Sequence, residues 1–288
     1  MTGNPRLPSP LSSFPMPKIQ DLFDLSNRAA IVTGGAGLLG KQFAKTLAEA
    51  GANVLIGDLD EVSAVAQADE LARAGYIAQA IALDVTRPES TQHAVETATH
   101  TWGSLDILVN SAALDPKFEP GKADQHTNAF ENYPLEQWNQ AVNVNLTGMF
   151  LMCQAAARVM KEQRSGSIVN ICSTYGLAGP DQRIYERPGE PPRYKPVYYS
   201  VTKAGVLGLT RYIATYYAGT AIRCNALTPG GVYNNHDEQF TKAYSYRTVI
   251  GRMAEKHEMN GALLFLASDA SSYMTGGNLV VDGGWTAW

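Results

Sequence analysis

Short apolar runs alternate with longer amphipathic stretches from Leu25 to the end of the 288-residue chain. The apolar runs have strand length and lack polar alternation, which is typical of strands buried on both faces. The stretches between them are long enough to be crossover helices that join parallel strands. The pattern therefore predicts an α/β fold with a doubly wound, mostly parallel seven-stranded sheet and helices on both faces. The predicted strands are Ala29–Val32, Asn53–Gly57, Ile77–Leu83, Leu105–Asn110, Ser167–Ile171, Ile222–Leu227 and Leu279–Val281.

Residues that begin and end helices agree with this division. Gly51 and Gly75 close two amphipathic stretches, and Pro88 followed by Glu89 is typical of a first helical turn. Helical character also extends from residue 196 to residue 217.

Three segments depart from the alternation. Residues 1–24 contain five prolines among Ser, Gly and polar residues and show no helical or strand period, so we expect a flexible tail. Residues 114–134 and 181–196 are longer than ordinary connections, and loops of that length are usually functional or disordered. We interpret both as substrate loops inserted in one domain that spans residues 25–288.

Charge and cysteine content narrow the class of protein. The chain has 23 Lys and Arg against 27 Asp and Glu, a net charge of −4, so no positive field favours nucleic acid or a membrane surface. No apolar stretch approaches a membrane span, and the N-terminus has no signal pattern. Cys153, Cys172 and Cys224 form neither a disulfide framework nor a CxxC pair. We expect a cytoplasmic protein with a small-molecule partner and no metal site.

A glycine-rich segment, TGGAGLLG at residues 33–40, lies between the first predicted strand and an amphipathic stretch. Gly35, Gly37 and Gly40 satisfy the GxGxxG spacing, which lets a pyrophosphate approach the backbone and a helix pack closely on the strand. The amides at the start of that helix attract phosphate groups. The placement favours a dinucleotide site, and the alternative is a glycine-rich turn without a ligand.

The second predicted strand leads to Asp58, at the distance from the glycines expected of a ribose-binding carboxylate. This carboxylate can accept hydrogen bonds from the ribose hydroxyls and would repel a 2′-phosphate. Neither Gly37 nor Leu59 is basic, so we expect NAD rather than NADP. A solvated turn carboxylate is the alternative interpretation, and Asp60 is a rival. Asp84, at the end of the third strand, is placed to meet the adenine edge.

Tyr199 and Lys203 are four residues apart in YSVTK, within a predicted helix, so their side chains should share one face. A phenol has a pKa near ~10, too high for a base at neutral pH. An ammonium at roughly 4 Å, with an effective dielectric constant near 20, attracts a phenolate by about 4 kcal/mol. That attraction would lower the pKa of Tyr199 by roughly three units, close to physiological pH. The pair is therefore a candidate for proton transfer, although most Tyr-Lys helix pairs are surface decoration.

Eight motifs in order make the chain resemble the short-chain dehydrogenase/reductase superfamily, from about Leu22 to Trp288. The resemblance implies a single-domain Rossmann fold of the compact branch. The motifs are TGGAGLLG at 33–40, LDV at 83–85, NSAA at 110–113, VNVNLTG at 142–148, SIVNICS at 167–173, YSVTK at 199–203, RCNALTPGG at 223–231 and MTGGNLVVDGG at 274–284.

The resemblance implies a catalytic role for four residues. Ser173 would hydrogen-bond the reacting oxygen, and Tyr199 would transfer its proton. Lys203 would hold the nicotinamide ribose and lower the pKa of the tyrosine, and Asn145 would anchor a proton-relay water. The alternatives are a capping hydroxyl at a strand end for Ser173 and an amide bonded to backbone for Asn145.

The resemblance also implies where a cofactor and partner subunits would bind. Family members are commonly tetramers, so we expect a homotetramer or homodimer, with Trp285 and Trp288 packed either against a neighbour or within the chain. The implied cofactor-binding residues are Gly34, Gly35, Gly37, Leu38, Leu39, Gly40, Asp58, Leu59, Asp84, Val85, Asn110, Ala112, Tyr199, Lys203, Pro229, Gly230 and Val232.

Some features depart from the compact branch. The glycine spacing TGxxGxxG is more typical of the extended branch, which includes sugar epimerases and dehydratases. Too few residues follow Lys203 for that branch's separate substrate lobe, and VNVNLTG and VDGG belong to the compact branch. An NAD-dependent sugar epimerase or dehydratase is therefore one alternative function. A non-catalytic dinucleotide-binding protein is another, although such a protein has no need of a complete catalytic set.

The insertion at residues 181–196 contains four cations that are able to clamp a carboxylate, phosphate or sulfonate: Arg183, Arg187, Arg193 and Lys195. The alternative is a solvated loop edge.

Three further segments resemble oxidoreductases of flagellin-glycosylation and nonulosonic-acid sugar pathways, which implies a carbohydrate substrate. They are NSAALDPKF at 110–118, STYG at 173–176 and PGGVYNN at 229–235. We expect an NAD-dependent oxidoreductase that interconverts a secondary alcohol and a ketone on a sugar, sugar acid or polyol.

Overall fold

The computed structural model describes residues 17–115 and 128–288. It contains one seven-stranded sheet in the order β3-β2-β1-β4-β5-β6-β7, and every adjacent pair of strands is parallel. The strands are β1 (Ala29–Thr33), β2 (Asn53–Asp58), β3 (Ala78–Ala82), β4 (Ile107–Asn110), β5 (Ser165–Ile171), β6 (Ala221–Pro229) and β7 (Asn278–Val281). The predicted α/β fold and all seven strands are confirmed. The strand order reverses direction between β1 and β4, which in open α/β sheets is where ligands bind.

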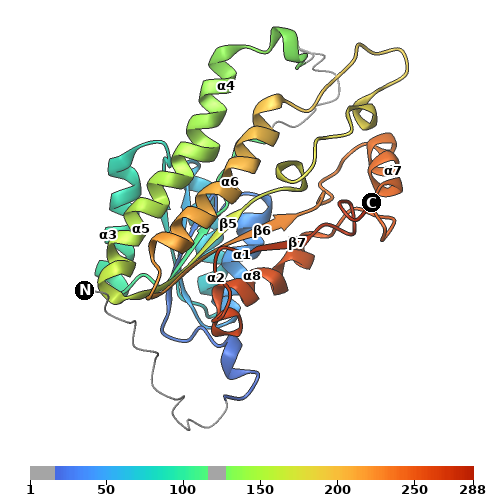
Figure 1. Ribbon diagram of the computed structural model, residues 1–288. Helices are drawn as coiled ribbons and strands as arrows, with labels where there is room; N and C mark the ends of the chain where they lie inside the picture. Colours follow the sequence, from blue (N-terminus) through green and yellow to red (C-terminus); the bar gives the residue numbers. More distant parts are fainter. Residues whose placement is uncertain (1–16, 116–127) are drawn as a thin grey trace, which may run out of the picture.

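Helices cover both faces of this sheet (Figure 1). They are α1 (Leu38–Glu49), α2 (Glu61–Arg73), α3 (Pro88–Trp102), α4 (Leu135–Val142), α5 (Met149–Gln163), α6 (Val197–Tyr216), α7 (Glu238–Tyr246) and α8 (Asn260–Ala267). The predicted boundaries at Gly51, Gly75 and Pro88 are confirmed, since α1 and α2 end just before the two glycines and α3 begins at the proline. The helix predicted from residue 196 is α6.

Three buried clusters form the core. Alternate strand residues such as Ile31 and Leu108 pack under α3, α5 and α6. Their neighbours Val32 and Val109 point to the opposite face and pack under α1, α2 and α8. The third cluster lies beyond the sheet and joins the 181–196 insertion, α7 and the C-terminal segment, which Figure 1 shows gathered together. Its buried members are Tyr175, Ile184, Tyr185, Tyr244, Met253 and Trp285.

Short helical turns occupy several connections. A π-helix labelled η3 (Asn143–Gly148) joins α4 to α5. The 3-10 turns are η1 (Asp21–Phe23), η2 (Phe130–Asn132), η4 (Thr174–Gly176), η5 (Gln182–Tyr185), η6 (Lys256–Met259) and η7 (Asp269–Ser271). Within the described residues, no helix combines the length and apolar character needed to cross a membrane.

The tail and the two long loops differ in part from the expectation. Residues 17–24, the end of the expected tail, are folded, because η1 packs beside η7 and the next residue, Leu25, is fully buried. The expectation for residues 1–16 lies outside the described residues, as does most of the 114–134 loop. The 181–196 segment is folded around η5 and is therefore no disordered excursion.

Candidate active site

The glycine loop lies against the segment that follows β4. Gly34 has a φ of 61°, and a Cβ there would lie 2.7 Å from the Cα of Ala112. A Cβ on Gly40 would overlap the carbonyl group of Gly34, so only glycine allows α1 to pack this closely. The Thr33 hydroxyl accepts hydrogen bonds at 3.1 Å from the N–H groups of Ser111 and Ala112. Sequence analysis missed Thr33, although a hydroxyl directly before the glycines was a usable signal.

The first turn of α1 is open to an anion. Gly37 is its N-cap in an extended conformation, and among the described residues no side chain caps this helix. The amide groups of Leu38 and Leu39 belong to the first turn, whose N–H groups have no partner within a helix. Such a helix start attracts phosphate groups. The loop and helix therefore fit the pyrophosphate of a dinucleotide.

Asp58 is fixed beside the glycine loop. One carboxylate oxygen accepts the N–H of Ala36 at 2.9 Å, and the other accepts the N–H of Asp60 at 3.1 Å. Asp60 itself caps α2, because its carboxylate accepts hydrogen bonds from the backbone and the hydroxyl of Ser63. The predicted ribose-binding carboxylate is therefore next to the phosphate loop, whereas its rival is used in a helix cap.

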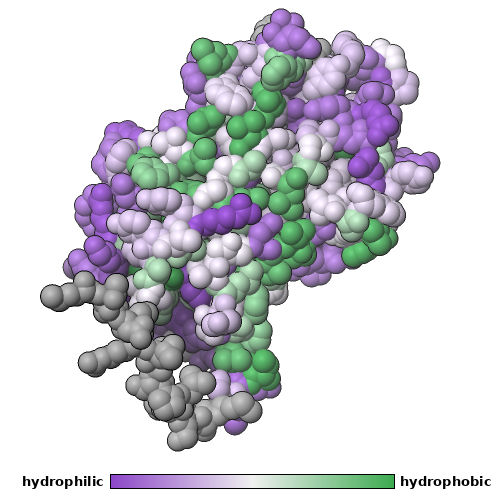
Figure 2. All heavy atoms as spheres, viewed as in Figure 1, coloured by the Kyte–Doolittle hydropathy of each residue, from purple (hydrophilic) through white to green (hydrophobic). Residues whose placement is uncertain are grey.

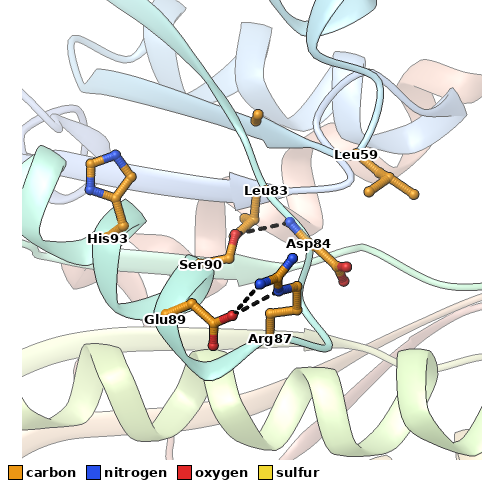
Figure 3. A pocket seen from close by; sticks show the side chains of 8 residues that line it. Leu59, Leu83, Asp84, Arg87, Glu89, Ser90 and His93 are labelled. Carbon is orange, nitrogen blue, oxygen red and sulfur yellow. Dashed lines mark hydrogen bonds and ion pairs between the residues drawn. The ribbon is translucent and has the colours of Figure 1, made fainter.

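A hollow of about 480 Å³ lies at the carboxyl ends of β2 and β3 and is lined by Leu59 and Asp84 (Figure 3). The N–H of Asp84 donates to the Ser90 hydroxyl at 3.1 Å. The hydroxyl of Thr86 donates to the Asp84 carboxylate and thereby lowers the pKa of that carboxyl group. Two predicted cofactor residues therefore line one hollow, while their predicted neighbour Val85 is buried against Gly148.

Asn110 does not offer its side chain to a cofactor. The side chain is buried in the core, and its amide donates to Asn170 Oδ1 at 2.8 Å and to Cys153 Sγ at 3.2 Å. Asn170 in turn donates to the Thr210 hydroxyl at 3.0 Å. The side chain of Asn110 therefore supplies a polar link between β4, β5 and α5, and a cofactor contact of this residue, which would be made by its main chain, stays a prediction.

The nicotinamide side of the predicted site is formed where β6 ends. Pro229 is the last residue of that strand, and the N–H of Gly230 donates to the carbonyl of Val281 at 2.9 Å. Any Cβ on Gly230 would lie 2.7 Å from the Cα of Asp282. Val232 forms an isolated parallel bridge with Ala254. These contacts hold the turn against the end of β7.

Ser173, Tyr199 and Lys203 come together beside the end of β5. Ser173 follows that strand, and its hydroxyl lies close enough to the Tyr199 hydroxyl to oppose the rise of the pKa of Tyr199. The Lys203 ammonium lies 5.8 Å from the centre of the Tyr199 ring and donates to the carbonyl of Ile171 at 2.9 Å. The predicted shared face of Tyr199 and Lys203 is confirmed. Ser173 also has the capping role that was its alternative, since its hydroxyl accepts the N–H of Tyr175 at 3.2 Å.

The pKa of Tyr199 is raised, whereas the sequence led us to expect a lowered pKa. Burial raises this pKa well above 10, the charge of Asp115 raises it further, and the hydrogen bond with Ser173 opposes them. Burial also lowers the pKa of Lys203 below its usual value. Removing both charged groups from water costs more free energy than their mutual attraction returns, and this desolvation outweighs the Coulomb attraction expected from the spacing. Burial therefore favours the neutral phenol of Tyr199, which is the form that can donate a proton.

Asn145 binds backbone, which was the alternative interpretation of this residue. Its Oδ1 accepts the N–H of Leu114 at 2.6 Å, and its Nδ2 donates to the carbonyl of Leu114 at 3.1 Å and to the Thr202 hydroxyl at 3.3 Å. Its side chain thereby links the loop after β4 to α6, and the expected role of Asn145 as an anchor for water stays a prediction. The π-helix η3 carries this residue, and such bulges are frequent at functional sites.

The insertion does not present four free cations. Each of its cations forms an ion pair with a carboxylate of the protein, and whether they clamp an anionic substrate stays a prediction. The pairs are Arg183 with Asp181, Arg187 with Asp237, Arg193 with Glu190 and Lys195 with Asp115. Only the last pair is shown in contact with Tyr199, because the Lys195 ammonium lies 4.2 Å from the centre of that ring.

Aromatic residues enclose this end of the site. The ring of Tyr175 meets Tyr199 edge-on at 6.4 Å, and its hydroxyl is 3.0 Å from that of Tyr185. Tyr244 stacks on Trp285 at 4.2 Å. Trp285 is therefore buried within its own chain, which was the alternative to packing against a neighbouring subunit. Sequence analysis missed Tyr185 and Tyr244, and only the abundance of tyrosine near the insertion hinted at them.

Comparison with known proteins places this site in a family. The family model described as Enoyl-(Acyl carrier protein) reductase matches residues 35–286. A 3-alpha-(or 20-beta)-hydroxysteroid dehydrogenase of Mycobacterium tuberculosis is 36% identical over 263 residues, 91% of each chain. A cis-4-hydroxycyclohexanecarboxylate dehydrogenase of Sinomonas cyclohexanicum is 36% identical over 270 residues, 91% of this chain and 98% of the relative.

One similar solved structure contains a bound dinucleotide. The gluconate 5-dehydrogenase of Burkholderia cenocepacia, in complex with NADP and tartrate, has a TM-score of 0.82 and 30% identity, and the match covers 94% of this chain and 100% of that one. These relatives are not specifically flagellin-glycosylation enzymes, so they support the family but not the expected resemblance to that subgroup. The chain belongs to the short-chain dehydrogenase/reductase family and is an NAD(P)-linked oxidoreductase that acts on the CH–OH group of an alcohol or on the corresponding ketone.

Proposed function

We propose that this protein is an NAD-dependent dehydrogenase that interconverts a secondary alcohol and a ketone on a sugar, sugar acid or polyol. The observation that carries the proposal is the convergence of Ser173, Tyr199 and Lys203 beside the end of β5, on the same edge of the sheet as the glycine loop. Positioning of this kind converts a reaction between separate molecules into one within a single complex.

In the reductive direction, Tyr199 donates its proton to the carbonyl oxygen while Ser173 hydrogen-bonds that oxygen. A bound nicotinamide supplies the hydride. The position of Lys203, buried and bonded to Ile171, suits a group that holds the nicotinamide ribose. Asn145 acts on this chemistry indirectly, since it holds Leu114 against the helix that carries Tyr199.

The preference for NAD rests on Asp58. Its carboxylate is fixed by the N–H of Ala36 beside the glycine loop, where the ribose of a dinucleotide would lie in this fold. A 2′-phosphate at this position meets a negative charge. The gluconate 5-dehydrogenase relative holds NADP, so the family accepts either dinucleotide and the local charge decides.

The substrate class follows from the relatives and from the insertion. Two of the compared enzymes are named for hydroxylated acids, gluconate and 4-hydroxycyclohexanecarboxylate. The loops that frame Tyr199 carry polar and aromatic side chains, which suits a substrate with a ring or several hydroxyl groups. The resemblance to flagellin-glycosylation enzymes points in the same direction, toward a carbohydrate.

We also propose a homotetramer or homodimer in the cytoplasm. Figure 2 shows apolar residues among polar ones over the helical face of the molecule. Phe150 of α5 and Val201, Tyr212 and Tyr216 of α6 are exposed. Light scattering coupled to size-exclusion chromatography would measure the mass of the assembly. The three free, buried cysteines agree with a reducing compartment.

The test of this function is a screen of NADH and NADPH absorbance over sugars, sugar acids, polyols and their ketones. Tyr199→Phe is expected to lower turnover by about a thousandfold or more, since it removes the acid and leaves the ring. NADH binding, followed by fluorescence, should persist. Tyr212→Phe, on the exposed side of the same helix, is the matched control.

Two outcomes would count against the proposal. If the Tyr199→Phe variant kept near-normal turnover, Tyr199 would not be the proton donor. If substrate were converted without net change in NADH and the cofactor stayed bound through dialysis, the enzyme would be an epimerase or dehydratase.

A further inference from the structure

Lys195 lies over the ring of Tyr199 but belongs to the insertion, four residues before the family's tyrosine motif. Its ammonium is 4.2 Å from the ring centre, closer than the ammonium of Lys203 at 5.8 Å. The two cations therefore reach the same ring from different segments of the chain. The family roles described above account for Lys203 and leave Lys195 without a function.

The position of Lys195 is fixed from both sides. Its backbone N–H donates to the side chain of Gln182 in η5 at 2.9 Å. The next residue, Pro196, is buried and is the N-cap of α6. Only 10% of the Lys195 side chain is exposed to solvent, so its ammonium is held in place.

The partner of Lys195 is much more exposed than Lys195 itself. The Lys195 Nζ donates a hydrogen bond to Asp115 Oδ1 at 2.5 Å, yet 56% of the Asp115 side chain is exposed. A buried ammonium needs an anion, because an unpaired buried charge is costly. An exposed carboxylate on a loop can be exchanged for another anion at little cost, since water replaces the lost contacts.

We propose that Lys195 binds the carboxylate of the substrate in exchange for Asp115, so that the enzyme acts on hydroxy acids and oxo acids in preference to neutral alcohols. This inference rests on the proposed function, and it names the substrate class of that same site. The exchange replaces one carboxylate on Lys195 by another, and no covalent bond changes.

The surroundings favour a carboxylate over a phosphate. Lys195 differs from the three arginines of the insertion because its ammonium is the group of this set that lies against the ring of Tyr199. A phosphate is usually bound by several donors or by a guanidinium. The ring of Tyr175 meets Tyr199 edge-on at 6.4 Å, so the surroundings of Lys195 are aromatic as well as charged.

The experiment compares matched acid and neutral substrates. D-Gluconate is paired with D-glucitol, and 4-hydroxycyclohexanecarboxylate with 4-(hydroxymethyl)cyclohexanol, so that each pair differs by one carboxylate. The wild-type enzyme should have a kcat/KM at least about tenfold higher for the better acid. Lys195→Met keeps the length of the chain and removes its charge, and should lower kcat/KM for the acid by about ten- to a hundredfold. For the neutral partner the change should stay within about threefold.

Two further variants sharpen the comparison. Asp115→Asn removes the competing anion, so it should lower the KM of the acid several-fold and leave the KM of the neutral partner unchanged, while it moves the pH profile of oxidation alike for both substrates. Arg193→Met removes a cation of the same insertion whose partner is Glu190, and it should change neither substrate. Unaltered NADH binding and circular dichroism would show that each variant is folded.

The outcomes separate the two proposals. The proposal for Lys195 is overturned if the wild-type enzyme prefers the neutral partners, or if Lys195→Met lowers acid and neutral activity equally while the dehydrogenase activity itself stands. The proposed function fails if the wild-type enzyme oxidises none of the alcohols and reduces none of the ketones, and the proposal for Lys195 then falls with it.

Discussion

The side-chain amide of Asn145 pairs with the main chain of Leu114 through two hydrogen bonds, one accepted at 2.6 Å and one donated at 3.1 Å. The same amide reaches the Thr202 hydroxyl on the helix that carries Tyr199. Asn145 therefore connects the loop after β4 to the proton donor. Because it is buried, its loss leaves backbone groups of Leu114 without these partners.

Asn145→Ala is expected to lower kcat/KM by about ten- to a hundredfold, since the loop beside Tyr199 loses its anchor. The free energy of unfolding should fall by about 1–3 kcal/mol, because buried polar groups lose their partners. Steady-state kinetics and urea unfolding measure the two effects. Asn143→Ala is the control, since Asn143 is exposed in the same π-helix. Equal effects of the two variants would contradict the role given to Asn145.

The pH dependence should differ between the two directions. The pKa of Tyr199 is raised well above 10 by burial and by Asp115. The proton donor is therefore present throughout the neutral range, and kcat/KM for ketone reduction should be flat there. The phenolate needed for alcohol oxidation grows by about tenfold per pH unit below that pKa, so oxidation should rise steeply with pH. Rates in both directions between pH ~6 and ~10 measure this.

Charged groups around Tyr199 give the control for that profile. Asp115, Lys195 and Lys203 lie around its ring, together with Tyr175 and Cys172. Asp115→Asn removes a charge that raises the pKa of Tyr199, so the oxidative rise should move to lower pH. An oxidation rate that is independent of pH across this range would show that Tyr199 is not the base.

Cofactor choice should follow the charge of Asp58. Asp58→Asn keeps an oxygen for the N–H of Ala36 and removes the charge that repels a 2′-phosphate. The ratio of kcat/KM for NAD over NADP should fall by about tenfold or more. Asp60→Asn is the matched control, because asparagine also caps a helix well and Asp60 serves the cap of α2. If both variants changed the ratio alike, Asp58 would not select the cofactor.

Asp181 should stabilise the insertion in a pH-dependent manner. It accepts hydrogen bonds from Arg183 and Arg247, and the pKa of its carboxyl group is lowered to about 2, chiefly by Arg183. Because the folded pKa is below the unfolded value, the stabilisation is present above pH ~4 and is lost as pH falls through about 2. Asp181→Asn should lower the free energy of unfolding at pH ~7 by about 1–2 kcal/mol.

Urea unfolding at neutral pH and near pH ~3 checks this, since the difference between wild type and variant should shrink in acid. Glu190→Gln is the control. Its carboxylate is exposed, and ion pairs that reach the surface contribute about 0–1 kcal/mol. A difference for Asp181→Asn that stayed constant with pH would exclude the carboxylate as its source.

Local patterns determined much of this protein. The seven strands, the glycine loop between β1 and α1, and the shared face of Tyr199 and Lys203 all followed from spacing along the chain. Each depends on residues close in sequence, whose side chains repeat with the period of a strand or a helix. The motifs in order were enough to indicate the family.

Only the tertiary structure decided what those residues meet. The pKa of Tyr199 rose because burial removed water, a cost that a spacing of four residues does not reveal. Asn145 found Leu114, and the insertion's arginines found carboxylates of the protein itself. Lys195 came to lie over Tyr199 because η5 and α6 fix it there. Charge pairing and desolvation depend on which distant groups share a volume, and that is set by the packing of the whole chain.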